Sequence, residues 1–296
     1  MPPKGLATGM LIAMSGITLL CAMDAVAKAL GAHVGTPFVV FVRYTGAALV
    51  LALYLAAFRQ PWPRRENFGR HAVRGALMGA TAFLFFFAVT RLPLAVVAAL
   101  AMTAPLYITG MSVLLLKERA HRLIFVALAF GLAGSAVIGF GGEMLEVSGE
   151  FEPLAWAAAV LAPVAYAGAI VLLKHHSSDE GAPQMTLAQS LAAALVAVPF
   201  LIPTFEWPPT ETYPMVFGVG FLGAMGYLLL ITGLRRIPAS IFAILDYTGL
   251  LWAALFGYIF FAELPPLQVW IGGGLIIVAC VIGTQASRRV TAVAAA

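Results

Sequence analysis

Charge is scarce in this sequence. Only 10% of its 296 residues are Asp, Glu, Lys or Arg, whereas 62% are hydrophobic and the mean hydropathy is +0.97. A soluble domain usually carries about 25% charged residues, so this composition cannot supply a water-exposed surface and indicates a membrane protein. The net charge of +4 is spread over short gaps between apolar runs, and we therefore expect no nucleic-acid partner.

Cysteines and catalytic motifs are also rare. The two cysteines, Cys21 and Cys280, lie inside apolar runs, which argues against a disulfide framework. The sequence contains no His-Glu-x-x-His, no Gly-x-Ser-x-Gly, no metal-ligand cluster and no Gly-Lys-Ser/Thr phosphate loop. We therefore expect neither an enzyme nor an ATPase, and neither a cofactor nor a metal.

Long apolar runs dominate the chain instead. A helix needs roughly 20 apolar residues to cross the hydrocarbon core of a bilayer. Ten such runs lie near 6–30, 37–58, 72–91, 93–116, 122–140, 153–174, 185–204, 213–235, 238–261 and 266–286. We expect an all-α integral membrane protein of ten transmembrane helices. The breaks at Pro93 and Pro238 are so tight that helices 3 and 4, and helices 8 and 9, are expected to be antiparallel neighbours.

The positive charges alternate between the gaps. If the N-terminus is cytoplasmic, the inside segments hold fourteen Lys and Arg residues and the outside segments hold only Arg91. This bias is typical of cytoplasmic loops. It predicts a multi-pass protein of a bacterial-type inner (plasma) membrane, with both termini in the cytoplasm and the lipid bilayer as its surroundings.

The two halves of the chain resemble each other. A shift of 145 residues lays the segment 91–118 on 236–263 without a gap, and a shift of 146 brings Lys28 onto Lys174. The matched pairs are Arg91 with Arg236, Pro93 with Pro238, Thr103 with Thr248 and Glu118 with Glu263. We expect two five-helix repeats, residues 1–145 and 146–296. Because five is odd, the second repeat enters the membrane from the opposite side.

Inverted repeats are typical of secondary transporters, because two similar halves can exchange conformations around a central site. A channel or scaffold built by duplication is the alternative. The spans, the repeat and the segments Pro93–Glu118 and Pro238–Glu263 resemble the EamA-type drug/metabolite transporter superfamily, and within it the YddG-type aromatic amino acid exporters. The resemblance implies a central cavity lined by helices 1, 3, 4, 6, 8 and 9. It also implies export of small amphipathic metabolites, chiefly aromatic and other neutral amino acids; a carrier of other drugs or metabolites is the alternative.

Four ionisable side chains lie inside the apolar spans: Asp24, Lys28, Arg43 and Asp246. Such residues are costly in a membrane and usually face the bundle interior. Asp24, Lys28 and Arg43 lie at similar depth and predict either a site for a zwitterion or an ion-pair network that locks helices 1 and 2; Lys28 could instead reach the interface. Asp246 aligns with Ala101 and predicts a proton-coupling or ammonium-binding group, or a hydrogen bond to a neighbouring helix or to the backbone.

Aromatic and soft side chains complete the candidate substrate-binding set: Phe83, Met102, Tyr107, Tyr166, Tyr227, Tyr247 and Trp252. A mid-span Tyr needs a partner for its hydroxyl, whereas intramembrane Phe more often faces lipid or core. Helices 5 and 10 are rich in small residues and are expected to form a scaffold or a homodimer face. Glu118 and Glu263 are expected to cap the helix that follows each of them or to order the loop.

Overall fold

Helices make up all the secondary structure of the described chain. The computed structural model describes residues 4–89, 97, 100–118, 121–140, 152–176, 180–262 and 267–294. The α-helices are α1 (Lys4–Gly31), α2 (Thr36–Ala57), α3 (Phe68–Val89), α5 (Ala104–Leu115), α6 (Arg122–Phe140), α7 (Pro153–His175), α8 (Ala182–Leu201), α9 (Tyr213–Leu234), α10 (Ala239–Asp246), α11 (Thr248–Phe261) and α12 (Leu267–Ala294). Three 3₁₀ turns accompany them, at Arg65–Asn67, Ile202–Thr204 and Thr210–Thr212.

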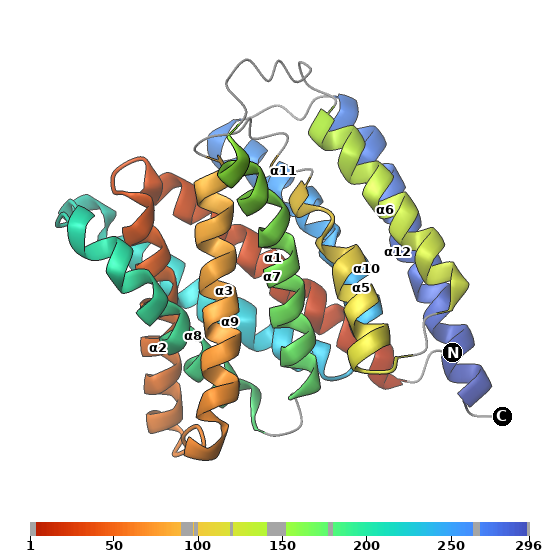
Figure 1. The fold of residues 1–296 in the computed structure, drawn as a ribbon, viewed down its shortest axis with the longest axis horizontal. Helices are drawn as coiled ribbons and strands as arrows, with labels where there is room; N and C mark the ends of the chain where they lie inside the picture. The colour runs from red at the N-terminus through yellow and green to blue at the C-terminus, as the bar shows by residue number, and fades with distance from the viewer. Residues whose placement is uncertain are drawn as a thin grey trace.

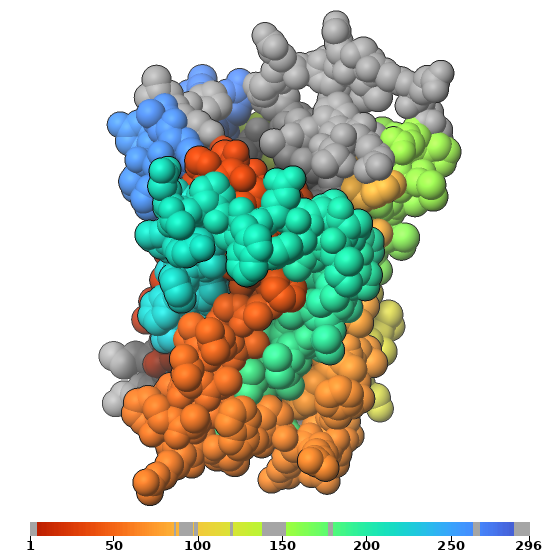
Figure 2. Space-filling view, turned by 90° about the vertical axis from the view of Figure 1, so that its left-hand side faces the viewer, coloured from red at the N-terminus to blue at the C-terminus, as the bar shows by residue number. Residues whose placement is uncertain are grey.

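The helices suit a membrane. Within the described residues, seven are long and apolar enough to cross a bilayer, with α10 and α11 counted as one span, and two shorter apolar helices cover Ala104–Leu115 and Arg122–Val137. The expected number of ten remains a prediction. Helices prevail because lipid offers no partners to the backbone. Apolar side chains cover the outside, such as Leu53 on α2 and Leu195 on α8 (61% and 67% exposed). Figure 2 shows the face of the molecule to which α2 and α8 contribute.

The packing order differs from one expectation. α9 packs mainly along α1 and α2, whereas α10 and α11 pack against α1, α5 and α12. The helix α1 therefore lies between α9 and the α10–α11 pair. The expectation that helices 8 and 9 are direct neighbours was wrong, because the connection 235–238 only turns the chain and leaves room for the first helix to enter.

The α6–α12 pair lies at one side of the bundle, opposite α2 and α8 (Figure 1). Small residues allow this close contact: a Cβ added to Gly134 would lie 2.5 Å from the Gly272 carbonyl oxygen. Exposed apolar side chains such as Phe125 and Ile277 cover its outer surface. None of the candidate site residues lies on this pair.

Helices 4 and 9 of the expected count are interrupted at equivalent positions. A turn at Met102–Thr103 precedes α5, and Tyr247 separates α10 from α11. The hydroxyl of Thr103 donates to the Leu100 carbonyl (2.5 Å), and the hydroxyl of Thr248 donates to the Leu245 carbonyl (2.6 Å). The two helices also end alike, because Lys117 and Ala262 both take a left-handed backbone conformation with φ of 54°.

Candidate functional site

An ion pair lies inside the helix bundle. Arg43 of α2 donates from Nη1 to Oδ1 of Asp24 on α1 at 3.2 Å, and the two side chains are 22% and 59% exposed. Asp24 lies on the face of α1 that meets α11, between Cys21, whose thiol donates to the Gly249 carbonyl (3.6 Å), and Lys28, whose Nζ lies 4.5 Å from the centre of the Phe261 ring. The neighbouring helices therefore cover the Asp24 carboxylate only in part.

Two tyrosines surround the guanidinium of this pair. Tyr227 of α9 interacts with Arg43 and with Tyr44, and the buried Tyr44 hydroxyl donates to the Met78 carbonyl of α3 at 3.3 Å. The Nε of Arg43 is buried and finds no hydrogen-bond partner in the described part of the chain. Buried N–H groups are normally paired. This donor is therefore available to an anionic group of a ligand.

A second polar pair adjoins the first. The Tyr166 hydroxyl of α7 donates to Oδ1 of Asp246 at the end of α10, at 3.3 Å. Tyr166 also interacts with Tyr227, and Cys21 interacts with both aspartates, so the two pairs are close neighbours. Together, five helices contribute a group that we name the central cluster: Asp24, Arg43, Tyr44, Tyr166, Tyr227 and Asp246.

The backbone beside Asp246 is also unusual. The Leu250 N–H donates to the Tyr247 carbonyl at 3.2 Å rather than to the Asp246 carbonyl, its partner in a regular α-helix. The main-chain oxygen of Asp246 therefore lacks the hydrogen bond that it would accept in a regular α-helix. The same residue also carries the carboxylate. Interrupted helices of this kind supply carbonyl oxygens to ligands inside membranes.

Other candidates lie elsewhere. Phe83 stacks on Phe200, with 4.0 Å between ring centres, and Phe200 is 49% exposed, so this pair lies near the outer surface. Tyr247 is fully buried, and its hydroxyl donates to the Leu128 carbonyl of α6 at 3.5 Å. Phe83 and Tyr247 therefore do not join the central cluster.

Three further candidate residues are neither fully buried nor part of the outer surface. Met102, Tyr107 and Trp252 are partly buried and pack against the main hydrophobic core, as Tyr166 does. Trp252 stacks on Phe256 with 6.3 Å between ring centres, and its buried indole Nε1 has no partner among the described residues. With no acceptor among the described residues, this indole N–H offers a donor to a ligand.

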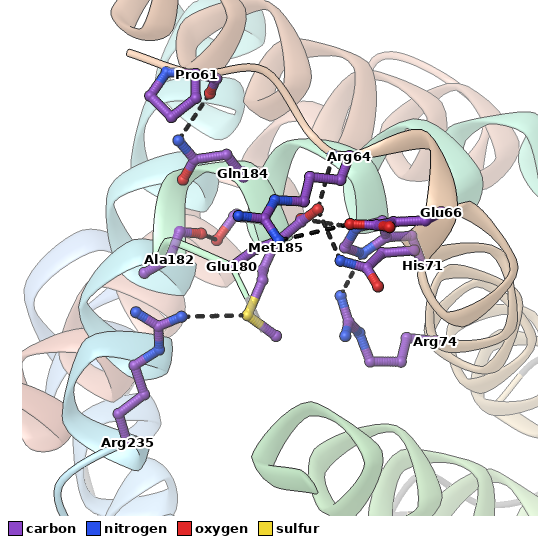
Figure 3. Close-up of polar contacts among 12 residues, drawn as sticks. Pro61, Arg64, Glu66, His71, Arg74, Glu180, Ala182, Gln184, Met185 and Arg235 are labelled. Carbon is purple, nitrogen blue, oxygen red and sulfur yellow. Dashed lines mark hydrogen bonds and ion pairs between the residues drawn. The ribbon is translucent and has the colours of Figure 1, made fainter. Parts of the chain in front are cut away.

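A second polar network, which the sequence did not reveal, joins the two halves at one end of the bundle. Glu180, in the connection between α7 and α8, is 3% exposed. It accepts hydrogen bonds from the Arg64 backbone N–H (2.6 Å), Asn67 Nδ2 (2.9 Å) and His71 Nε2 (2.9 Å) (Figure 3). Arg74 Nη2 donates to His71 Nδ1 at 2.7 Å, so the imidazole links a guanidinium to a carboxylate.

These bonds determine the ionisation of Glu180. Burial raises the pKa of its carboxyl group, but the hydrogen bonds from Asn67, Arg64 and His71 outweigh burial and hold the pKa below the ordinary value of 4.5. The partners are more than 100 residues apart along the chain. No local spacing in the sequence could have indicated this contact.

The same end holds the connection between α9 and α10. Lys174 Nζ donates to the carbonyls of Leu234 and Ile237, both at 2.7 Å. The Glu118 carboxylate accepts from the backbone N–H groups of Ala239 (3.0 Å) and Ser240 (3.4 Å). Each charge thus caps the helix end of opposite polarity. We name the connections α2–α3, α7–α8 and α9–α10 together the basic end.

This placement of Glu118 corrects one expectation. The carboxylate caps α10, in the other half of the chain, and not the following helix α6. The left-handed residue Lys117 turns the chain after α5 and thereby directs Glu118 across the bundle. Glu263, the matching residue, lies outside the described residues.

Comparison with known proteins agrees with this fold. The model of the EamA-like transporter family matches residues 7–140 and 154–284. The pseudopaline exporter CntI of Pseudomonas aeruginosa is 26% identical over 279 residues, which is 93% of this chain and 95% of the relative. The threonine/homoserine exporter RhtA of Escherichia coli is 27% identical, with 92% of both chains covered.

The chain is also similar to a transporter of another compound and to a protein of known structure. A riboflavin transporter of Vibrio cholerae is 27% identical over 252 residues, covering 83% of this chain and 82% of the relative. A crystal structure of another protein superposes with a TM-score of 0.81 at 19% identity, over 93% of this chain and 98% of the other. The structural match establishes a shared fold.

Proposed function

The chain belongs to the EamA-like transporter family, and from this premise we propose that it is a secondary transporter that exports small amphipathic metabolites, chiefly neutral amino acids. Export proceeds by alternating access through a central cavity. In this proposal the protein spans a bacterial-type inner membrane with both termini in the cytoplasm, and the basic end then faces the cytoplasm.

The central cluster is the observation that carries this proposal. Charged side chains inside a membrane bundle are costly and mark substrate pathways. Asp24 is 59% exposed although it faces other helices, and Arg43 retains an unpartnered Nε donor. A zwitterionic head group fits such a site, because its carboxylate can accept from Arg43 and its ammonium can approach an aspartate.

The helix packing supports two inverted repeats. A shift of about 145 residues exchanges α1 with α7, α2 with α8, α3 with α9 and α6 with α12. The contacts occur in exchanged pairs: α1 packs on α9 as α7 packs on α3, and α2 packs on α9 as α8 packs on α3. In the contacts α2–α8 and α6–α12, each helix packs against its own equivalent in the other half. Repeats 1–145 and 146–296 related by a two-fold axis would give this pattern.

Close helix crossings support the same relation. A Cβ added to Gly220 of α9 would lie 2.7 Å from the Gly46 Cα of α2. At the equivalent crossing of α3 and α8, a Cβ added to Gly75 would lie 2.7 Å from the Gln189 carbonyl oxygen. The matched glycines allow matched backbone contacts.

The related transporters differ in the class of molecule that they carry. One relative carries threonine and homoserine, whereas others carry pseudopaline or riboflavin. We favour amino acids because the central cluster presents both charges of a zwitterion. A larger metabolite is the second candidate, supported by the similarity to the riboflavin and pseudopaline transporters.

Transport can be tested in proteoliposomes that contain the purified full chain. We expect saturable counterflow of labelled phenylalanine, methionine or threonine, reduced at least tenfold in Arg43→Gln. Saturable flux of riboflavin without amino-acid flux would favour the second candidate. Flux that never saturates would indicate a channel and contradict a carrier of either class.

A further inference from the structure

Asp246 distinguishes two otherwise matching helix interruptions. Thr103 and Thr248 make the same hydrogen bond to the residue three positions earlier. Both interruptions also free the carbonyl of the residue before the turn: Pro105 has no N–H for Ala101, and Leu250 donates past Asp246. In the first half, alanine (Ala101) occupies the position that matches Asp246. A helix interruption of this kind therefore does not require a carboxylate at that position.

The charge of Asp246 is not balanced as that of Asp24 is. Asp24 pairs with Arg43 at 3.2 Å. Asp246 accepts from the neutral Tyr166 hydroxyl, and no ion pair with it occurs among the described residues. A carboxylate inside a membrane bundle requires a cationic partner or a proton. The central cluster therefore holds two acidic groups and one permanent cation.

In the part of the chain that the structure describes, the groups facing Asp246 supply no second cation. On the helices that pack against α10, the titratable groups near Asp246 in the described chain are Cys21 and Asp24 of α1, Tyr166 of α7 and Cys280 of α12. Tyr107 of α5 and Tyr247, next along the chain, are phenols, and phenols and thiols are uncharged at neutral pH. Glu118 and Lys174 lie at the other end of α10.

We propose that Asp246 binds either the protonated amine of the substrate or one proton, so that the protein exchanges substrate for H⁺. This inference rests on the proposed export function. When the ammonium arrives, the neutral carboxyl group releases its proton and forms an ion pair. When the substrate leaves, a proton from the other side returns to the carboxylate, so Asp246 always has either an ammonium group or a proton as its partner.

The acceptors at this interruption match the donors of an ammonium group in number. An ammonium has three N–H donors. The carboxylate of Asp246, its main-chain carbonyl and the Tyr166 hydroxyl are three oxygen acceptors around the interruption of helix 9. The substrate carboxylate would then accept from Arg43 Nε. Substrates of this site are primary amines with a neighbouring carboxylate.

Proton release provides a direct test. L-Phenylalanine is added to the purified full chain in weakly buffered detergent solution, with 3-phenylpropionate, which lacks the amine, as the second probe. Below the pH at which the carboxyl group of the free protein titrates, we expect about one proton released per bound phenylalanine. We expect the affinity for phenylalanine to fall about tenfold per pH unit below the pH at which the carboxyl group titrates.

Asp246→Asn mimics the protonated site. We expect it to bind phenylalanine at least tenfold more weakly, to release no proton, and to bind 3-phenylpropionate better than the native protein does. Asp246→Glu should retain proton release, and Ala101→Asn, at the equivalent position of the other half, serves as the control for folding. Ala101→Asn should leave proton release unchanged.

Each result is decisive. Phenylalanine binding without proton release, or proton release that persists in Asp246→Asn, would overturn the exchange while leaving transport intact. Failure of the native protein to bind phenylalanine, methionine or threonine would overturn both this inference and the amino-acid function. If Asp246→Asn does not fold, the pH dependence of the native protein and of Asp246→Glu still decides the question.

Discussion

The basic end and the central cluster use polar groups in opposite ways. At the basic end, Lys174 makes two contacts of 2.7 Å to backbone carbonyls, and Glu180 accepts from three donors. In the central cluster the hydrogen bonds are 3.2 and 3.3 Å long, and Arg43 Nε has no partner in the described chain. Lys174 and Glu180 are thus engaged by protein groups, whereas Arg43 retains a donor for a ligand. The basic end is not satisfied throughout, because Gln184 Oε1 and Arg235 Nε also lack a partner among the described residues.

This difference separates stability from transport. Buried charges with several protein partners hold elements together, and removal of one partner leaves the others unsatisfied. Partly exposed charges with few partners contribute little to the free energy of unfolding. Substitutions at the basic end should therefore lower stability most, and substitutions in the central cluster should lower transport at nearly constant stability.

The largest loss of stability is expected for Glu180→Ala. Three donors lose their acceptor, and each buried unsatisfied donor costs about 1–3 kcal/mol. We expect the melting temperature in detergent to fall by roughly 5–10 °C. Glu66→Ala is the matched control, because Glu66 is 71% exposed and contacts only Arg64 at 3.5 Å among the described residues.

The effect of Glu180 should also depend on pH. The hydrogen bonds hold the pKa of this carboxyl group below 4.5 in the folded protein. The ionised group therefore stabilises the fold fully above pH 4.5 or so, and this contribution is lost as the pH falls through the lower, folded-state pKa. A difference in melting temperature between the native protein and Glu180→Ala that stayed constant down to acidic pH would contradict this account.

A smaller loss is expected for Lys174→Met. Two charged hydrogen bonds to the end of α9 disappear, which should cost about 2 kcal/mol. Lys28→Met is the control at the repeat-equivalent position, where the exposed ammonium lies over the Phe261 ring and contributes less than about 1 kcal/mol. Equal shifts of the two melting temperatures would show that the two ends of the bundle do not differ.

The smallest change in stability is expected for Asp24→Asn. The carboxylate is 59% exposed, so loss of its ion pair with Arg43 is expected to cost less than loss of the buried contacts at the basic end. Counterflow of labelled phenylalanine should nevertheless fall at least tenfold, because Arg43 loses its orientation. Asp24→Glu should recover part of the flux. Full counterflow by Asp24→Asn would show that the pair serves only the fold.

The membrane helices and part of the site were predictable. Apolar runs of about 20 residues predict helices, because a bilayer leaves few alternatives to the backbone. The Asp24–Arg43 proximity followed from similar depth on two successive helices. The contact of Tyr166 with Asp246 did not, because depth along a helix says nothing about rotation around its axis. The rotation of α10 and α11 also directs Tyr247 away from the central cluster, and the sequence did not reveal this rotation either.

The basic end illustrates the opposite limit. Glu180 sits in a short connection and looks like any solvated charge in the sequence. Only the approach of α3 to the α7–α8 connection buries it and supplies Asn67 and His71 as donors. The capping of α10 by Glu118 likewise depends on a partner 121 residues away.

The amino-acid sequence by itself determined that this chain forms apolar helices suited to a membrane. It also determined that the two halves match and which charged residues lie inside the apolar runs. These properties follow from the cost of exposing polar groups to lipid, which acts on each segment separately. The tertiary structure decided that α1 lies between α9 and α10, and which charges meet. Pairing across the bundle depends on helix rotation and close packing, which no single segment encodes.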